Sequence, residues 1–335
     1  MTKSLRSFLL LYFFLLILPF IGCSEDKAPE IQVTQADYVI NFTEDVPVFS
    51  GSNAMAYVKK QVSFGPRNPN SAGHKATLEY LSSELGKYAD TLILQNFVYT
   101  GYDEEKLDLT NIIGKINPAS KNRILLSAHW DCRPRAEQDP DPALRDKPIP
   151  GANDGASGVA VLLELAKNLK FKKPAYGIDI VFFDGEDYGK QSDLSNFCIG
   201  AKYFAALKPA NYNPEFGILL DLVGDKKAEF HKEPNSVAIN KKLVNEVWQI
   251  ASAIGAKTFI NREGSAVYDD HIPLGQAGIK TIDIIDAGLV GGKDADASRN
   301  YWHTQNDVPE NLSEETLAEV GSVLTHLIYS VDFRK

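Results

Sequence analysis

Mostly apolar runs recur along the chain and indicate β-strands. Residues 91–100 and 107–116 alternate apolar and polar positions, which is typical of half-exposed strands. Four later runs are almost continuously apolar, as expected for central strands that are covered on both faces. The pattern therefore predicts a sheet with a buried centre, built from residues 123–128, 178–183, 216–222 and 279–285.

Apolar residues at helical spacing lie before and between these runs. The predicted helices cover residues 53–63, 71–87, 159–169 and 241–254. Alternation of strands and helices predicts an α/β fold, namely a single three-layer α/β/α domain with a central mixed, largely parallel sheet. Ligands of such sheets bind beyond the carboxyl ends of the strands, so a functional site is expected there.

The first residues have the composition of an export signal. Lys3 and Arg6 precede an apolar run over residues 8–20, which is too short to cross a bilayer comfortably. Cys23 resembles the lipidated cysteine of a bacterial lipobox, although Phe20 is an imperfect fit to that motif. A secreted form and an uncleaved membrane anchor are the alternatives. We predict a signal peptide over residues 1–22, a lipidated N-terminus and tether over 23–45, and a folded domain over 46–335.

Charge and cysteine content narrow the picture further. The formal net charge of -9 and the lack of a basic run argue against nucleic acid as a partner. The length of 335 residues is ample for one large domain. Beyond Cys23 there are two cysteines, Cys132 and Cys198, which either pair in an oxidising compartment or remain as buried thiols.

Histidines and carboxylates gather at the predicted strand ends. Asp154 lies in a glycine-rich turn before a helix, and Asp221 interrupts an apolar strand, where an unpaired charge is costly. Glu186 and Asp187 are adjacent, so one carboxylate can bind a metal while the other transfers a proton. Catalytic zinc sites use nitrogen and oxygen ligands and keep one position open. The candidate site residues are His129, Asp154, Glu186, Asp187, Asp221 and His303.

Each candidate has an ordinary structural explanation when it is taken alone. A lone His129 is more often a polar residue with satisfied hydrogen bonds, Asp154 could cap a helix, and Asp221 could pair with a buried base. The joint pattern favours a metal-dependent enzyme that acts on peptides. A structural role alone is expected for three other histidines, His74, His231 and His326.

From about residue 53 onward the chain resembles the zinc-dependent exopeptidase fold (phosphorylase/hydrolase-like), which bacterial aminopeptidases and glutaminyl cyclases share. Phe64-Gly65-Pro66-Arg67 and the helix after it resemble the segment that precedes the core of that fold. The resemblance to two-metal aminopeptidases implies that Asp154 bridges two zinc ions and that Glu186 is the general base. It assigns Asp187 and His303 to one ion, and His129 and Asp221 to the other.

The resemblance to glutaminyl-peptide cyclotransferases, particularly their bacterial members, is closer. Its most discriminating segment is Asp269-Asp270-His271-Ile272-Pro273, and the pair Trp302-His303 adds to it. The animal enzymes carry glutamate where this chain has Asp187. Three further segments carry the same resemblance: His129-Trp130-Asp131-Cys132-Arg133-Pro134, Gly151-Ala152-Asn153-Asp154-Gly155-Ala156 and Asp187-Tyr188-Gly189.

This closer resemblance implies a reaction and a set of roles. The reaction is cyclisation of the N-terminal glutamine of a peptide to pyroglutamate with release of ammonia. One zinc ion would polarise the γ-carbonyl, and Glu186 would shuttle the proton. The implied zinc ligands are Asp154, Asp187 and His303, and the implied catalytic group is Glu186, Asp221 and Asp269. Trp302 is the first candidate for the wall of the substrate pocket, and Trp130 and Tyr188 are weaker candidates.

The resemblance to glutaminyl cyclases implies the partners, and the N-terminal segment implies the location. The partners are peptides or proteins with an N-terminal glutamine, and the protein is expected to be a monomer. It would meet the membrane only through a lipid anchor at Cys23, as an exported lipoprotein of the cell envelope, or else be secreted.

Two other functions are weighed against cyclisation. A two-zinc aminopeptidase stays open because all five ligand positions of that site are filled. An inactive peptide-capturing module is disfavoured, because the proposed ligands and Glu186 are all present.

Overall fold

The computed structural model describes residues 38–190 and 193–333. The predicted signal peptide, Cys23 and most of the predicted tether lie outside these residues. Strand β1 (Tyr38–Ile40) falls within the range assigned to the tether, 23–45, and pairs antiparallel with β10 (Val331–Phe333) close to the C-terminus. The folded unit therefore includes the last part of that range.

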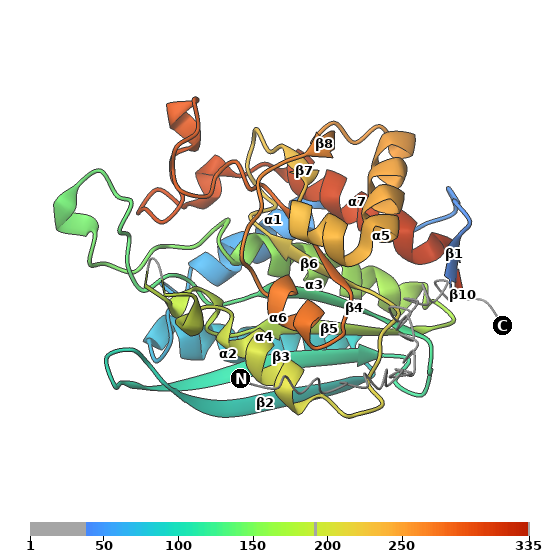
Figure 1. Ribbon diagram of the computed structural model, residues 1–335, viewed down its shortest axis with the longest axis horizontal. Coiled ribbons are helices and arrows are strands. Elements are labelled where there is room, and N and C mark those ends of the chain that lie inside the picture. Colours follow the sequence, from blue (N-terminus) through green and yellow to red (C-terminus); the bar gives the residue numbers. More distant parts are fainter. Residues whose placement is uncertain (1–37, 191–192, 334–335) are drawn as a thin grey trace, which may run out of the picture. The chain divides into compact units, whose positions relative to one another are not determined.

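The centre of the fold is a six-stranded mixed sheet, with strand order β2-β3-β5-β4-β6-β9 (Figure 1). Strand β3 pairs antiparallel with both β2 and β5, whereas β5, β4, β6 and β9 run parallel to one another. The predicted mixed, largely parallel sheet is thus confirmed. Its strands are β2 (Thr91–Thr100), β3 (Lys106–Ile116), β4 (Arg123–His129), β5 (Gly177–Phe183), β6 (Gly217–Asp221) and β9 (Thr281–Ile285).

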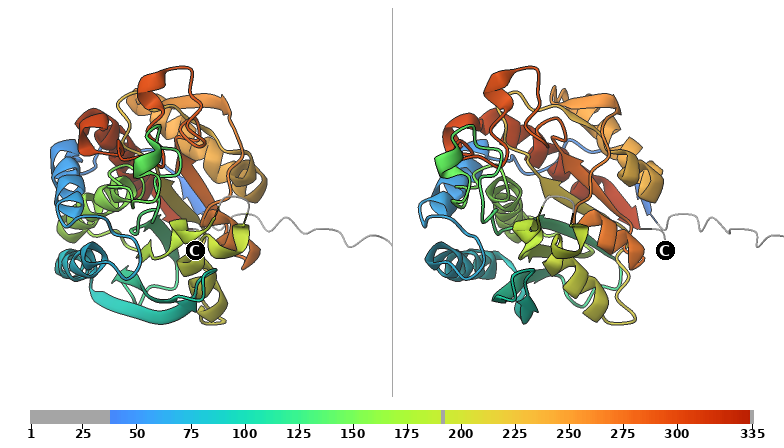
Figure 2. Two further views of the ribbon diagram at one scale, coloured as in Figure 1. Left: turned by 90° about the vertical axis from the view of Figure 1, so that its left-hand side faces the viewer. Right: turned by 60° about the vertical axis from the view of Figure 1, so that its left-hand side comes forward.

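Helices cover both faces of this sheet, which confirms the three-layer prediction (Figures 1 and 2). One face carries α1 (Gly51–Val62), α2 (Ala72–Tyr88), α3 (Ala156–Phe171) and α7 (Glu314–Ser330). The other face carries α4 (Ile199–Leu207) and α6 (His271–Gln276). Helix α5 (Pro234–Ile254) packs on β9, α7 and the small sheet of β7 (Phe230–Lys232) and β8 (Phe259–Glu263).

The two-residue period of the strands distributes apolar side chains to both layers. In β4, Ile124 and Leu126 belong to the core under α1, α3 and α7, whereas Leu125 belongs to the core under α4 and α6. Strand β3 was predicted to be half-exposed, but most of it is buried. The reason is that α2 and α4 both pack on β3, so only the edge strand β2 keeps the half-exposed pattern.

Helix starts follow local capping chemistry. Ser50, Ser71 and Ser313 each accept a hydrogen bond from a backbone N–H in the first turn of the helix that follows. Helix α5 begins at Pro234, earlier than the predicted residue 241, because Glu233 caps it, and the non-helical Asn240 interrupts it. The apolar periodicity detects only the part after this interruption.

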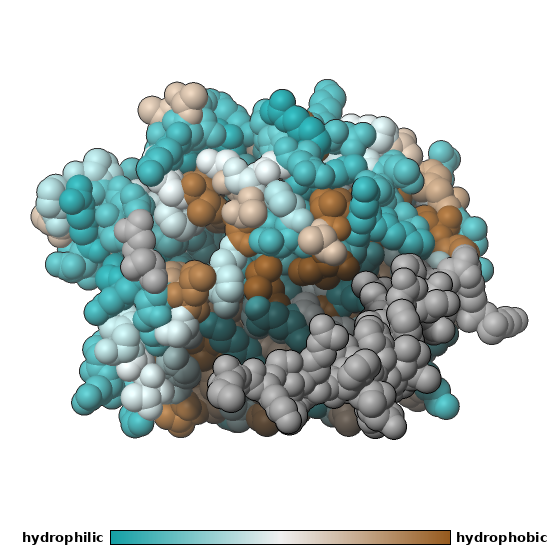
Figure 3. Space-filling view, viewed as in Figure 1, coloured by the Kyte–Doolittle hydropathy of each residue, from teal (hydrophilic) through white to brown (hydrophobic). Residues whose placement is uncertain are grey.

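One face of the described residues is mainly polar (Figure 3), and the two cysteines are buried. The face shown in Figure 3 is largely hydrophilic, with smaller hydrophobic groups near its middle. No helix within residues 38–190 and 193–333 is both long enough and apolar enough to cross a membrane. Cys132 and Cys198 are both buried and free, so the alternative of a disulfide between them is not realised.

Candidate active site

The predicted site residues meet at the carboxyl ends of the central strands, as expected for this topology. His129 ends β4 and Asp221 ends β6. Glu186 and Asp187 form a short 3-10 turn after β5. A cavity of about 310 Å³ opens at this edge. Its lining includes Asp154, Glu186, Asp187, Asp221, Asp269, Trp302 and His303.

One cluster of potential metal ligands consists of Asp154, Asp187 and His303. Nε2 of His303 lies 3.5 Å from Oδ2 of Asp154 and 3.4 Å from Oδ2 of Asp187. All three residues are buried, and one ligand atom from each lies within 4.8 Å of the others. This is the set that the sequence predicted for the zinc ion.

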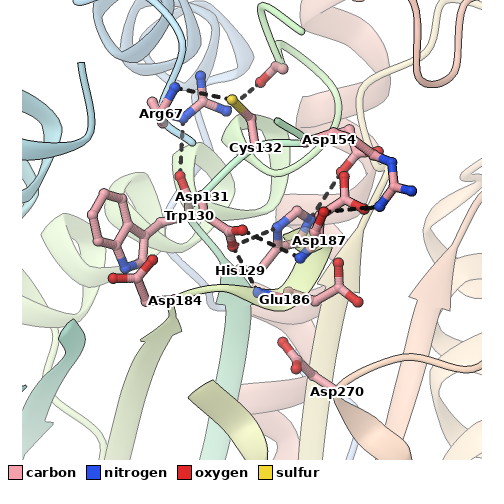
Figure 4. A network of polar contacts seen from close by, with 12 residues as sticks. Arg67, His129, Trp130, Asp131, Cys132, Asp154, Asp184, Glu186, Asp187 and Asp270 are labelled. Atoms are coloured by element: carbon pink, nitrogen blue, oxygen red, sulfur yellow. Dashed lines mark hydrogen bonds and ion pairs between the residues drawn. The ribbon is translucent and has the colours of Figure 1, made fainter. Parts of the chain in front are cut away.

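A second cluster shares Asp154 with the first. Nε2 of His129 lies 3.2 Å from Oδ1 of Asp154 and 3.1 Å from Oδ1 of Asp221. Asp154 thus offers one carboxylate oxygen to each cluster, which is the arrangement of a two-metal bridge. Figure 4 shows His129, Asp154 and Asp187 converging.

The cluster of Asp154, Asp187 and His303 has ligand types suited to zinc and an unpaired oxygen that an ion could bind. Two carboxylates and one imidazole are typical ligands of a catalytic zinc site. Oδ2 of Asp187 is buried and has no hydrogen-bond partner, which is costly for a carboxylate oxygen unless a cation satisfies it. The residues present therefore fit the ion.

Glu186 stands beside this cluster and faces the cavity. Burial, followed by the nearby charge of Asp269, raises the pKa of Glu186 well above its ordinary value. Oε1 of Glu186 also lies 3.4 Å from the Cys198 thiol, which donates to it. A glutamate with such a pKa can hold a proton at neutral pH and give it up within one reaction cycle.

Asp221 and Asp269 place further carboxylates at the same cavity. Burial raises the pKa of Asp221 to about 7, although the hydrogen bond with His129 acts in the opposite direction. Oδ2 of Asp269 is buried without a hydrogen-bond partner. The structure thus brings together the three carboxylates that were predicted as the catalytic group, and their mutual repulsion favours at least one shared proton.

The turn that carries Asp154 is held by backbone contacts. Asp307 accepts hydrogen bonds from the N–H groups of Asn153 and Asp154, at 2.7 and 3.1 Å. A Cβ atom on Gly155 would lie only 2.5 Å from Cε1 of His129. Glycine at this position therefore lets the turn approach the imidazole closely, which is the physical reason for part of the glycine-rich segment.

Asp131 is a site residue for which no separate role was predicted from the sequence. Its carboxylate accepts hydrogen bonds from the N–H groups of Glu186 and Asp187, at 3.0 and 3.3 Å, and lies 3.4 Å from Nδ1 of His129. It thereby orients residues of both clusters. The sequence signal was its place in the segment His129-Trp130-Asp131, but Glu186 and Asp187, which it orients, lie in the turn after β5.

Arg67 explains why the segment Phe64-Gly65-Pro66-Arg67 matters. Its side chain is fully buried and donates to the backbone carbonyls of Trp130, Pro150 and Gly151, at 3.0, 2.9 and 2.6 Å. Figure 4 shows this guanidinium beside Cys132. Arg67 thus ties together the two backbone segments that carry His129 and Asp154.

Of the three aromatic residues predicted to line the pocket, one lines the cavity and two lie elsewhere. Trp302 is half-buried, lines the cavity and stacks on His303 with 3.4 Å between ring centroids. Trp130 instead stacks on His74 in the core. Tyr188 packs among Phe97, Leu107, Leu109 and Ile199. Neither Trp130 nor Tyr188 is among the residues that line the cavity, which corrects the expectation that their rings form its wall.

The remaining histidines have structural surroundings. His74 is buried, and its Nε2 lies 2.9 Å from Oδ1 of Asp184. His326 lies within α7, with Nδ1 2.8 Å from the carbonyl oxygen of Ser322. His231 is only partly buried, and its Nε2 accepts from Arg262. Neither the cavity lining nor the two clusters around Asp154 include any of these three histidines.

The mixed α/β fold, together with the two clusters of potential metal ligands, is typical of metal-dependent exopeptidases. A model of peptidase family M28 matches residues 111–328, and the chain belongs to this family. The resemblance found in the sequence is therefore confirmed.

Solved structures of relatives extend this result. A glutaminyl cyclase from Tannerella forsythia is 43% identical, with a TM-score of 0.79 over 84% of this chain and 99% of that one. A Zn-dependent exopeptidase from Parabacteroides distasonis is also 43% identical, with a TM-score of 0.80 over 85% of this chain and 99% of that one. A glutaminyl-peptide cyclotransferase from Bos taurus is 22% identical over 77% of this chain and 76% of its own length.

Proposed function

We propose that the protein is a zinc-dependent enzyme that cyclises the N-terminal glutamine of peptides to pyroglutamate and releases ammonia. The observation that carries this proposal is the position of Glu186, a buried carboxylate with a raised pKa that faces the same cavity as the cluster of Asp154, Asp187 and His303. The similarity to a bacterial glutaminyl cyclase over nearly all of that enzyme supports it.

The ligand spacings favour one zinc ion. Tetrahedral zinc with bonds of 2.0–2.2 Å separates its ligand atoms by roughly 3.3–3.6 Å. The His303–Asp187 and His303–Asp154 separations of 3.4 and 3.5 Å match this spacing. In the other cluster, His129 and Asp221 are 3.1 Å apart and joined by a hydrogen bond. The cluster of Asp154, Asp187 and His303, whose separations match the spacing of zinc ligands, is the proposed zinc site.

The chemistry is an intramolecular acyl transfer. When bound, zinc acts as a Lewis acid toward the γ-carbonyl oxygen of the glutamine side chain. The cavity holds the glutamine folded, so that its α-amine lies close to its own γ-carbon, and this raises the effective concentration of the nucleophile. Glu186 accepts a proton from the attacking amine and donates it to the departing nitrogen, which leaves as ammonia. A C–N bond forms and another breaks, so no water is consumed.

The neighbouring residues support this proton transfer and the folded substrate. Burial and the negative charge of Asp269 keep the pKa of Glu186 high, so that a proton taken from the amine is retained until the leaving group needs it. Trp302 provides a flat apolar wall next to His303. We infer that this wall packs against the methylene groups of the glutamine.

A second candidate is a two-zinc aminopeptidase. The observation in its favour is that Asp154 offers one oxygen to each cluster. In that case Glu186 would take a proton from water, and a peptide bond would be cleaved. Cyclisation remains the proposed function because the similarity to a bacterial glutaminyl cyclase extends over nearly all of that enzyme.

We further propose that the protein is an exported lipoprotein anchored at Cys23 and that it acts as a monomer. The basic start, the short apolar run and Cys23 support export and lipidation. The proposed site is complete within one chain, so the proposed activity does not require a residue from a second copy. Metabolic labelling with a fatty acid should mark the wild type and leave Cys23→Ala unlabelled.

The decisive assay follows a glutamine-initiated peptide by mass spectrometry. We expect loss of ammonia with the peptide chain intact. Release of the first residue would instead establish the aminopeptidase.

Metal removal gives a further prediction. Dialysis of the purified protein against a chelator is expected to abolish ammonia release, because the ion no longer polarises the γ-carbonyl. One equivalent of zinc per chain should restore it, as measured by titration and elemental analysis. A requirement for two equivalents would contradict the single site.

A further inference from the structure

An ion pair between the buried Arg133 and the half-buried Glu137 lies beside the proposed zinc ligands, and both residues line the cavity. Both residues belong to the segment that follows β4. The Arg133 side chain is 1% exposed, and its Nε donates to Oε1 of Glu137 at 2.7 Å. Phe197 covers the guanidinium, with 5.2 Å from Cζ to the ring centroid. The geometry of this pair is therefore well defined.

Arg133 holds one of the proposed ligands. Its Nη1 donates to the backbone carbonyl of Asp187 at 2.9 Å and to Oδ1 of the same residue at 2.8 Å. Because Oδ1 is occupied, Oδ2 is the oxygen that remains free, and it is the one that lies 3.4 Å from Nε2 of His303. The guanidinium fork thus decides which oxygen of Asp187 faces the ion site.

Glu137 contacts His303, another of the proposed ligands. Its Oε1 lies 3.3 Å from Nδ1 of His303, and the neighbouring N–H of Gln138 donates to the carbonyl of His303 at 3.2 Å. A carboxylate at Nδ1 favours the tautomer with hydrogen on Nδ1, which leaves the lone pair of Nε2 for a metal. His303 has a positive φ of 54°, so its backbone also needs such support.

We infer that Arg133 and Glu137 act together as positioning residues that preset Asp187 and His303 for the cation, so that zinc affinity depends on the pair. The inference rests on the proposed zinc site. The two side chains contact two of its three ligands and each other, whereas neither provides a ligand atom to that cluster. Partners of metal ligands typically contribute 10–100-fold to metal affinity, because they orient the ligands before the metal arrives.

The test measures zinc affinity of the full chain by competition with a chromophoric chelator, using the metal alone. Glu137→Ala is expected to weaken zinc binding about 10–100-fold. Glu137→Gln should weaken it less, because the amide oxygen can still accept from His303 or Arg133. Arg133→Lys keeps the charge but cannot span Glu137 and Asp187 at once, so a loss of about 10-fold is expected. The matched control is Asp146→Asn, which removes an exposed carboxylate from the same loop and should leave affinity unchanged.

Two additional readouts separate positioning from folding. The melting temperature of the metal-free variants reports loss of structure, and the absorption spectrum of the cobalt-substituted protein reports ligand geometry. We expect an altered cobalt spectrum in Glu137→Gln with a melting temperature close to the wild type. If Glu137→Ala does not fold, Glu137→Gln and Arg133→Lys decide the question.

The outcomes distinguish this inference from the proposed function. Wild-type zinc affinity and an unchanged cobalt spectrum in the folded variants would overturn the positioning role and leave cyclisation untouched. Absence of zinc binding in the wild type would overturn the proposed zinc site itself. Ammonia release by the wild type is measured separately, so the two failures cannot be confused.

Discussion

Replacing Glu186 by Gln is expected to lower kcat for ammonia release by about 10²–10⁴-fold. The amide has nearly the same shape as the carboxylate, but it can neither accept the proton of the attacking amine nor return it to the leaving group. KM should change little, because Glu186 is one of many groups that line the cavity. Steady-state kinetics on a glutamine-initiated peptide would measure both values.

A matched control separates loss of the proton carrier from loss of a buried charge. Glu164 is a buried glutamate on α3 that accepts from Asn53 and lies outside the cavity lining. Glu164→Gln should retain nearly wild-type kcat. A Glu186→Gln variant that cyclises at the wild-type rate with zinc bound would refute the assignment of Glu186 as the proton carrier.

Replacing Arg67 by Met is expected to lower the free energy of unfolding by about 3–5 kcal/mol. Methionine fills a similar volume, but it leaves the carbonyls of Trp130, Pro150 and Gly151 buried without their donor. An orphaned buried acceptor costs about 1–3 kcal/mol, and partial relaxation of the loop reduces the sum of three. Equilibrium unfolding of the metal-free protein in urea would measure the difference.

An exposed arginine provides the comparison for this change. Arg145 also donates to a backbone carbonyl, that of Asp139 at 2.8 Å, but its residue is solvent-exposed. Water replaces the lost donor there, so Arg145→Met should change the free energy of unfolding by less than about 0.5 kcal/mol. Equal effects of the two substitutions would show that the three carbonyls do not depend on Arg67.

Much of the fold was predictable because burial imposes local periodicity. Residues 91–100 form β2 as predicted, and the runs at 123–128 and 178–183 form β4 and β5. The half-exposed character predicted for 107–116 was wrong because it depends on what packs on each face of β3. The apolar periodicity of a segment predicts that it is a strand, whereas the burial of its two faces is decided by helices from distant parts of the sequence.

The site residues were also largely predictable, since parallel strands bring their carboxyl ends to one edge of a sheet. His129, Glu186, Asp187 and Asp221 end or follow β4, β5 and β6 and therefore lie at this edge, whereas Asp154 is brought there by the turn before α3. Trp130 and Tyr188 show the limit of this argument. Both are adjacent in sequence to site residues, yet their rings enter the core.

What the sequence by itself determined is the class of fold, the types of ligand available and their place at the strand ends. These properties depend on residue type, spacing and strand order, all of which are local or topological. Only the tertiary structure decided which oxygen of Asp187 is free, that Arg133 and Glu137 support the ligands, and that His129 bonds to Asp221. Such contacts depend on differences of a few tenths of an ångström in the separations of side chains, most of them far apart in the chain, and no sequence pattern encodes those differences.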